Sequence, residues 1–170
     1  MGDGCTIAGL WKGLKDLYAI GFIDKLPRLI SVQAEGCCPL NRALQTGEDW
    51  RPMEENTLAD SIAVGVPRNA GKALNAVRES GGIAVNVSDE EILEAMRLLG
   101  RTQGVFGEPA GVKKALELGL LDPEATVVSI VTGNGLKDVQ SGIKAAGEPM
   151  LVRPDLDALL SAFAARGIRP

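Results

Sequence analysis

Histidine is absent from the 170-residue sequence, and this absence removes several kinds of active site. Without an imidazole the chain can form neither a Ser-His-Asp triad nor a Cys-His pair, and the usual zinc-ligand sets are excluded. Aromatic residues make up only 4% of the chain. We therefore expect a core built from Ala, Val, Ile and Leu.

Cysteine is also scarce, with Cys5, Cys37 and Cys38 as its only members. Three is an odd number, two of the residues are adjacent, and no Cys-x-x-Cys pair occurs, so a disulfide framework is not expected. The N-terminus has no apolar signal segment, and no run approaches the roughly 18 apolar residues of a membrane span. These features favour a cytoplasmic protein.

A strong excess of charge of either sign is missing as well. The sequence has 18 basic and 22 acidic residues, a formal net charge of −4, and no basic run. Partners such as nucleic acid or an anionic membrane are therefore not expected. The length suffices for one domain, residues 1–170, with its own core.

Short apolar segments alternate with amphipathic ones along the chain. Strands are expected over residues 29–34, 83–87 and 126–132, of which the last has the strongest pattern. Helices are expected over residues 7–18, 38–44, 58–63, 70–79, 88–99, 109–118 and 156–163. Ser88 and Glu91 have the spacing of a capping box. Strands separated by helices predict βαβ units, and hence a three-layer α/β/α domain with a mainly parallel sheet.

A glycine-rich segment, Gly2-Asp3-Gly4-Cys5-Thr6, lies directly before the first helix. Such a turn offers free backbone N–H groups and the positive end of the helix dipole to an anion. It matches neither common phosphate motif, because Ile7 replaces the third glycine of the Rossmann pattern and no Gly-Lys-Ser/Thr is present. On the pattern alone, a simple helix start capped by Thr6 or Asp3 is the favoured interpretation.

Thr132 opens a second glycine-rich turn, Thr132-Gly133-Asn134-Gly135, after the strongest expected strand. Ligands of open parallel sheets bind beyond the carboxyl ends of strands, so a ligand-binding turn and an ordinary turn are equally supported. Glu108 also precedes an expected helix, where an acidic residue is favourable without any site. Cys37 and Cys38 are expected to be small core residues.

Several of these segments together resemble threonine synthase, a fold type II pyridoxal-phosphate enzyme. The most specific match is Thr-Gly-Asn-Gly-Leu-Lys-Asp at residues 132–138. The other matching segments are residues 2–13, 27–36, 58–69, 77–82 and 107–111. Cysteate synthase and the serine/threonine dehydratases share much of this pattern.

The resemblance implies pyridoxal 5'-phosphate as cofactor. It assigns the cofactor phosphate to the backbone amides of Gly2, Asp3, Gly4, Cys5 and Thr6, and the pyridine nitrogen to Thr132. This reverses the preference for a simple helix start at residues 2–6. It assigns no catalytic residue and no metal ligand to this chain.

The lysine that binds the cofactor lies, in that family, in a Ser-Phe-Lys-Asp type motif far upstream of the phosphate loop, and no such motif occurs here. The chain therefore resembles the C-terminal portion of the enzyme, beginning at the phosphate loop, and is expected to be inactive alone. A split-gene half, a truncated gene product and an excised domain all fit this resemblance, and the expected partner is a complementing N-terminal domain that bears the lysine. The alternatives are a stand-alone module that binds phosphate or self-associates as a homo-oligomer, and a fragment of another type II enzyme such as cysteate synthase.

Overall fold

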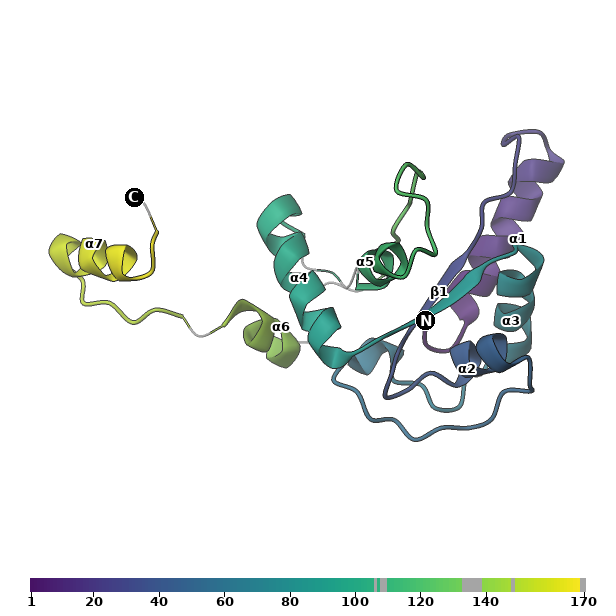
Figure 1. Ribbon diagram of the computed structural model, residues 1–170, viewed down its shortest axis with the longest axis horizontal. Coiled ribbons are helices and arrows are strands. Elements are labelled where there is room, and N and C mark those ends of the chain that lie inside the picture. Colours follow the sequence, from purple (N-terminus) through teal and green to yellow (C-terminus); the bar gives the residue numbers. More distant parts are fainter. Residues whose placement is uncertain (106, 108–109, 133–138, 148, 169–170) are drawn as a thin grey trace.

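The computed structural model describes residues 1–105, 107, 110–132, 139–147 and 149–168. Figure 1 shows helices arranged around a two-stranded sheet. In chain order the elements are α1 (Cys5–Ala19), β1 (Ile30–Ala34), α2 (Pro39–Thr46), the 3₁₀ turn η1 (Asp60–Ile62), α3 (Ala70–Glu79), β2 (Ile83–Val87), α4 (Asp89–Gln103), α5 (Ala110–Glu117), α6 (Val139–Ala146) and α7 (Leu156–Ala165). Among the described residues, none of the helices combines the length and apolarity needed to cross a lipid bilayer.

The two strands run parallel, with Ile30 opposite Ile83 and Ala34 opposite Val87. Helix α2 contacts both strands, and α5 contacts β2 from the other side of the sheet (Figure 1). Helices α1 and α3 pack together beside α2, while α4 packs against α5. Helices on both faces of a parallel sheet confirm the expected α/β fold class.

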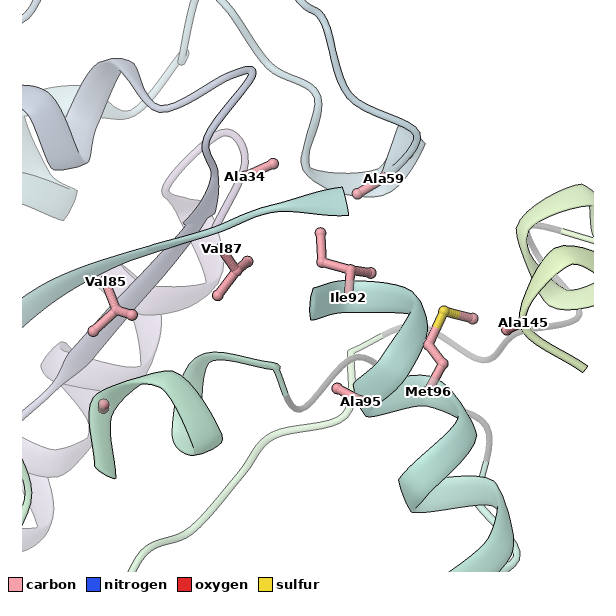
Figure 2. Close-up of a cluster of buried hydrophobic side chains, with 9 residues drawn as sticks. Ala34, Ala59, Val85, Val87, Ile92, Ala95, Met96 and Ala145 are labelled. Carbon is pink, nitrogen blue, oxygen red and sulfur yellow. The ribbon is translucent and has the colours of Figure 1, made fainter. Parts of the chain in front are cut away.

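The face of the sheet turned toward α4 and α5 is apolar and aliphatic, as the low aromatic content predicted. Val85, Val87, Ile92 and Met96 are each no more than 2% exposed and form one cluster (Figure 2). Gly111 lets α5 approach this face closely, since a Cβ there would lie 2.1 Å from Val32 Cγ2. The cluster fixes the positions of both helices on the sheet.

Most of the expected helices are confirmed where the apolar pattern was clear. Helix α3 spans residues 70–79 as predicted, and α2 begins at Pro39. The capping box at the start of α4 is present, because the Ser88 hydroxyl accepts from Glu91 N and the Glu91 carboxylate accepts from Ser88 N. These elements depend on short-range patterns, which explains why they can be read from sequence.

The helix expected over residues 58–63 is wrong, because the structure has only the three-residue turn η1 there. Asp89, at the start of α4, accepts hydrogen bonds from the Thr57 hydroxyl and from Leu58 N. These bonds tie the preceding residues to another helix, and Pro67 lies shortly after. The segment is therefore fixed by a contact with α4 and not by a helix of its own.

The strand expected over residues 126–132 is also wrong. These residues form no strand, and Val128 is 83% exposed. A strand is stabilised by hydrogen bonds to a neighbour, whereas the sheet of the described residues consists of β1 and β2. Helix α6, which the sequence analysis did not predict, follows and packs against α4.

Candidate functional site

The glycine-rich segment at residues 2–6 forms a tight loop against the start of α3. Gly4 is buried and has φ +81°, a backbone conformation that favours glycine. A Cβ at Gly4 would lie 2.6 Å from the Ala73 Cβ, and one at Gly2 would lie 2.9 Å from Val64 Cγ2. Both glycines are therefore needed for the loop to take this position.

Helix α1 begins within this segment, at Cys5, with Gly4 as its N-cap and without a side-chain hydrogen bond to its first turn. The cap expected from Asp3 or Thr6 is therefore wrong. The first intrahelical bond around the cap runs from Ala8 N to Gly4 O, so the N–H groups of Cys5, Thr6 and Ile7 precede it. Cys5 and Thr6 are exposed. An uncapped, accessible helix N-terminus of this kind is suited to an oxyanion such as phosphate.

Hydrogen bonds hold the loop at two points. Asp3 Oδ1 accepts from Arg68 N at 3.1 Å, and the Asp3 carbonyl accepts from Asn69 N at 3.0 Å. At the N-terminal end of the loop, Gln33 Nε2 donates to the Met1 carbonyl at 2.9 Å. The loop is thus fixed both to the turn before α3 and to β1.

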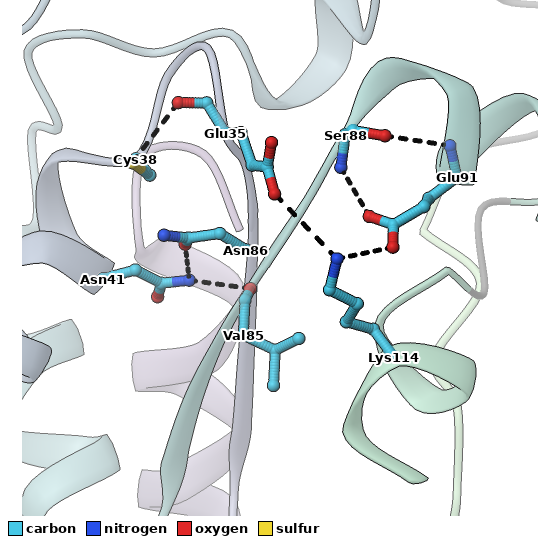
Figure 3. A network of polar contacts seen from close by, with 8 residues as sticks. All are labelled: Glu35, Cys38, Asn41, Val85, Asn86, Ser88, Glu91 and Lys114. Atoms are coloured by element: carbon cyan, nitrogen blue, oxygen red, sulfur yellow. Dashed lines mark hydrogen bonds and ion pairs between the residues drawn. The ribbon is translucent and has the colours of Figure 1, made fainter. Parts of the chain in front are cut away.

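A buried polar network lies next to this end of the loop, between α2 and the sheet. Asn41 Nδ2 donates to the Val85 carbonyl at 2.9 Å and to Asn86 Oδ1 at 2.7 Å (Figure 3). Asn41 also donates its backbone N–H to Gln33 Oε1 at 2.8 Å and accepts from the Ser31 hydroxyl. Sequence analysis did not identify this network. Its signal is a polar residue at alternate positions of an apolar strand, Ser31 and Gln33.

Lys114 forms a second polar group at the carboxyl ends of the strands, where it is paired with Glu91 and lies 4.0 Å from Glu35 (Figure 3). Burial tends to raise the pKa of Glu91, but hydrogen bonds from Lys114 and the Ser88 backbone outweigh it and lower that pKa. The bond to Glu91 raises the pKa of Lys114. Lys114 is therefore a protonated ion-pair partner and is poorly suited to act as an amine nucleophile.

The second predicted ligand residue, Thr132, is exposed and lies outside any strand. Residues 133–138 of its motif, together with Glu108, fall outside the described residues. Cys37 and Cys38 are buried, and burial raises the pKa of both thiols. This placement agrees with their expected role as core residues.

Comparisons with known proteins show which family the chain is similar to. The family model of pyridoxal-phosphate dependent enzymes matches residues 1–133. The threonine synthase of Methanocaldococcus jannaschii is 41% identical over 94% of this chain and 41% of its own length. The threonine synthase of Mycobacterium tuberculosis is 40% identical over 85% of this chain and 40% of its own length.

Solved structures give the same result for the fold. The T.th. threonine deaminase aligns with a TM-score of 0.53 at 28% identity, over 73% of this chain and 44% of its own. The threonine synthase from Escherichia coli aligns with a TM-score of 0.58 over 81% of this chain and 32% of its own, at 23% identity, which supports the fold alone. The chain thus spans less than half the length of these relatives. Since the family model covers most of the sequence, the chain belongs to the family of pyridoxal-phosphate dependent enzymes.

Proposed function

We propose that this chain is the phosphate-binding portion of an enzyme that converts O-phospho-L-homoserine to L-threonine and phosphate. In this proposal residues 1–170 are one α/β domain that corresponds to the C-terminal part of a threonine-synthase-like enzyme. The observation that carries it is the loop at residues 2–6, which leaves the first amides of α1 uncapped and accessible. The identity to threonine synthases over most of the chain supports the same reaction.

Each proposed ligand residue has a defined task. The backbone N–H groups of Gly2, Asp3, Gly4, Cys5 and Thr6 would hold the cofactor phosphate, and the Thr132 hydroxyl would donate to the pyridine nitrogen. Pyridoxal phosphate, when bound, supplies the electron sink that stabilises carbanions of the substrate. The chain's own contribution is to hold that group in place and to orient it.

The lysine that the chemistry requires is proposed to lie in a region that corresponds to the part of the relatives that this chain does not match. The Ser-Phe-Lys-Asp type motif is absent from the sequence, and the hydrogen bond to Glu91 raises the pKa of Lys114, which disfavours a neutral amine there. We therefore propose that these residues are inactive alone and act together with a domain that bears the lysine.

Exposed apolar side chains support a partner of this kind. Val128 is 83% exposed, Leu151 is 98% exposed and Leu156 is 68% exposed. Large contiguous apolar surfaces mark protein contact sites, and in this proposal these side chains belong to such a surface. They suit either the lysine domain or a further copy of the chain in a homo-oligomer, in the cytoplasm.

Co-expression tests the proposal. The chain is produced with the N-terminal part of the Methanocaldococcus jannaschii threonine synthase, where the family resemblance places the Ser-Phe-Lys-Asp type motif. The expected result is a visible cofactor absorbance band and phosphate release from O-phospho-L-homoserine, neither of which the chain shows alone. A pair that associates but has neither property would overturn the proposal.

Two glycine variants locate the site within that experiment. Gly4→Ala places a Cβ against Ala73 and is expected to abolish cofactor binding. Gly47→Ala is the matched control, because Gly47 has φ +76° but open space around it and ends α2 far from the loop in sequence. Equal loss in both variants would point to general backbone strain and would contradict the assigned loop.

A further inference from the structure

The proposed phosphate loop contains an acidic residue, Asp3, whose negative charge would repel a phosphate if it faced the same way as the loop amides. We propose that Asp3 is a positioning residue that fastens the loop at residues 2–6 to the turn before α3 and keeps its own charge away from the anion. This inference rests on the proposed function, since it concerns the same loop.

The first support is the set of bonds that Asp3 makes. Its carboxylate accepts from Arg68 N at 3.1 Å and its carbonyl accepts from Asn69 N at 3.0 Å, so one residue is bonded to two consecutive residues of the turn. The contact spans 65 residues of sequence. It places the next residue, Gly4, against Asn69 and Ala73, where no side chain fits.

The second support is electrostatic. The Arg68 guanidinium Nε lies 3.8 Å from Asp3 Oδ1, and the Arg68 side chain is 87% exposed whereas that of Asp3 is 35% exposed. The carboxylate is thus half-buried against its own counter-charge. Because the pair is close to neutral, the loop presents mainly the partial positive charges of its N–H groups and the α1 dipole.

The third support is the second anchor at Met1. Gln33 Nε2 donates to the Met1 carbonyl, and Gln33 is itself held by Asn41 N in the buried network. The residue before the loop is therefore fixed to β1, while Asp3 fixes the loop to the turn before α3. With both points held, the positions of the Cys5 and Thr6 amides are set before any ligand arrives, which lowers the entropic cost of binding.

Cys5 supplies a reporter inside the loop. It is exposed, whereas Cys37 and Cys38 are buried with raised pKa values, so alkylation by iodoacetamide should begin at Cys5. Peptide mass spectrometry then gives its rate of reaction in the full chain. The rate is measured without ligand and with increasing inorganic phosphate, with pyridoxal 5'-phosphate, and with pyridoxal as the control that lacks the phosphate.

The variants separate the hydrogen bond from the charge. Asp3→Ala removes both, Asp3→Asn keeps an acceptor for Arg68 N, and Asp16→Ala is the matched control, because Asp16 pairs with Lys12 farther along α1. In Asp3→Ala the free Cys5 rate and the phosphate concentration for half protection should each rise about tenfold, the equivalent of one hydrogen bond to a charged group. In Asp3→Asn both quantities should stay within about threefold of their wild-type values, and in Asp16→Ala both should equal the wild-type values.

The outcomes distinguish the two proposals. If neither inorganic phosphate nor pyridoxal 5'-phosphate protects Cys5 in the wild type, the phosphate site is refuted. The Cys5 alkylation rates measured without ligand would still test whether Asp3 positions the loop. Unchanged rates and protection in a folded Asp3→Ala would overturn the positioning role, and so would an equal loss in Asp3→Asn. If Asp3→Ala does not fold, Asp3→Ser takes its place, because its shorter side chain lacks the reach of the carboxylate.

Discussion

Residues 83–96 and residues 120–132 both carry runs of apolar side chains, but they bury them to very different extents. Val87 and Ile92 are each 1% exposed, whereas Val128 is 83% exposed and Ile130 is 51% exposed. The first run has a parallel neighbour in β1 and helices against it, and the second has no strand partner among the described residues. Apolar content alone therefore does not produce burial, because a neighbouring element must be present to receive it.

Helices show the same contrast. Helix α4 begins with a capping box and buries three of its residues, whereas α7 has a capping aspartate but buries none. Figure 1 shows α4 against the rest of the fold and α7 away from the sheet. Both helices begin with a capping side chain, so their starts do not distinguish them. Their contributions to stability differ because only α4 buries side chains against other elements. The following variants test this difference, beginning with the largest expected effect.

The largest contrast is expected between two aliphatic truncations. Ile92→Ala removes a side chain from the cluster beneath the sheet and should lower the free energy of unfolding by about 3 kcal/mol. Leu156→Ala in α7, where the side chain is 68% exposed, should change it by less than about 0.5 kcal/mol. Urea unfolding followed by circular dichroism measures both. Comparable losses would show that α7 is packed in solution.

The next contrast concerns the polar network. Asn41→Ala removes the amide acceptor of the Ser31 hydroxyl and the amide donor to Asn86 Oδ1 and should cost about 2–3 kcal/mol. Asn75→Ala, at an exposed position of α3, is the control and should be neutral within about 0.5 kcal/mol. The same urea titration compares them. A neutral Asn41→Ala would mean that the network contributes nothing to stability.

Two helix caps form the third pair. Ser88→Ala removes the cap of α4 and should lower the global free energy of unfolding by about 1 kcal/mol. Asp155 accepts from Ala158 N at 2.9 Å, yet Asp155→Ala should only increase hydrogen exchange within α7 and leave the global value unchanged. Mass-resolved hydrogen exchange separates the two effects. An equal change in the global free energy of unfolding in Ser88→Ala and Asp155→Ala would contradict this prediction.

The smallest effect is expected from the Glu91–Lys114 ion pair. Because the pKa of Glu91 is lowered in the folded state, its contribution is present above its usual value of 4.5 and is lost as pH falls through the folded pKa. Glu91→Gln keeps a capping-box residue but removes the charge. The free energy of unfolding of this variant should depend less on pH below about 4.5. At pH 7 it should be lower than that of the wild type by less than about 1 kcal/mol. Thermal unfolding from pH 3 to pH 7 measures this. A profile with the wild-type slope would contradict the assignment.

The sequence predicts the elements whose signals are short in range. Residues 70–79, the capping box at Ser88, and the loop before α1 all depend on patterns within about one or two helical turns. The resemblance to threonine synthase also identified the family before any geometry was known. Within the loop, however, the pattern suggested a side-chain cap, and the structure has the left-handed Gly4 instead.

What the sequence does not predict depends on distant partners. The strand expected at residues 126–132 has the right composition but lacks a neighbouring strand in the described residues. The helix expected at residues 58–63 is replaced by bonds to Asp89, which lies in another element. The bond from Gln33 to Met1, 32 residues apart, likewise leaves no local trace. Such contacts need the fold to be known first.

Asn41 also has a consequence for how the sheet is aligned. It bonds β1 through Ser31 and β2 through Asn86 at the same time. A slip of one residue between the strands would turn the Asn86 amide toward the apolar cluster and bring an aliphatic side chain to Asn41. A sheet with a shifted register is thus destabilised at two places, at Asn86 and at Asn41. Helix α2, which carries Asn41, therefore favours the one register in which the loop at residues 2–6 is held in place.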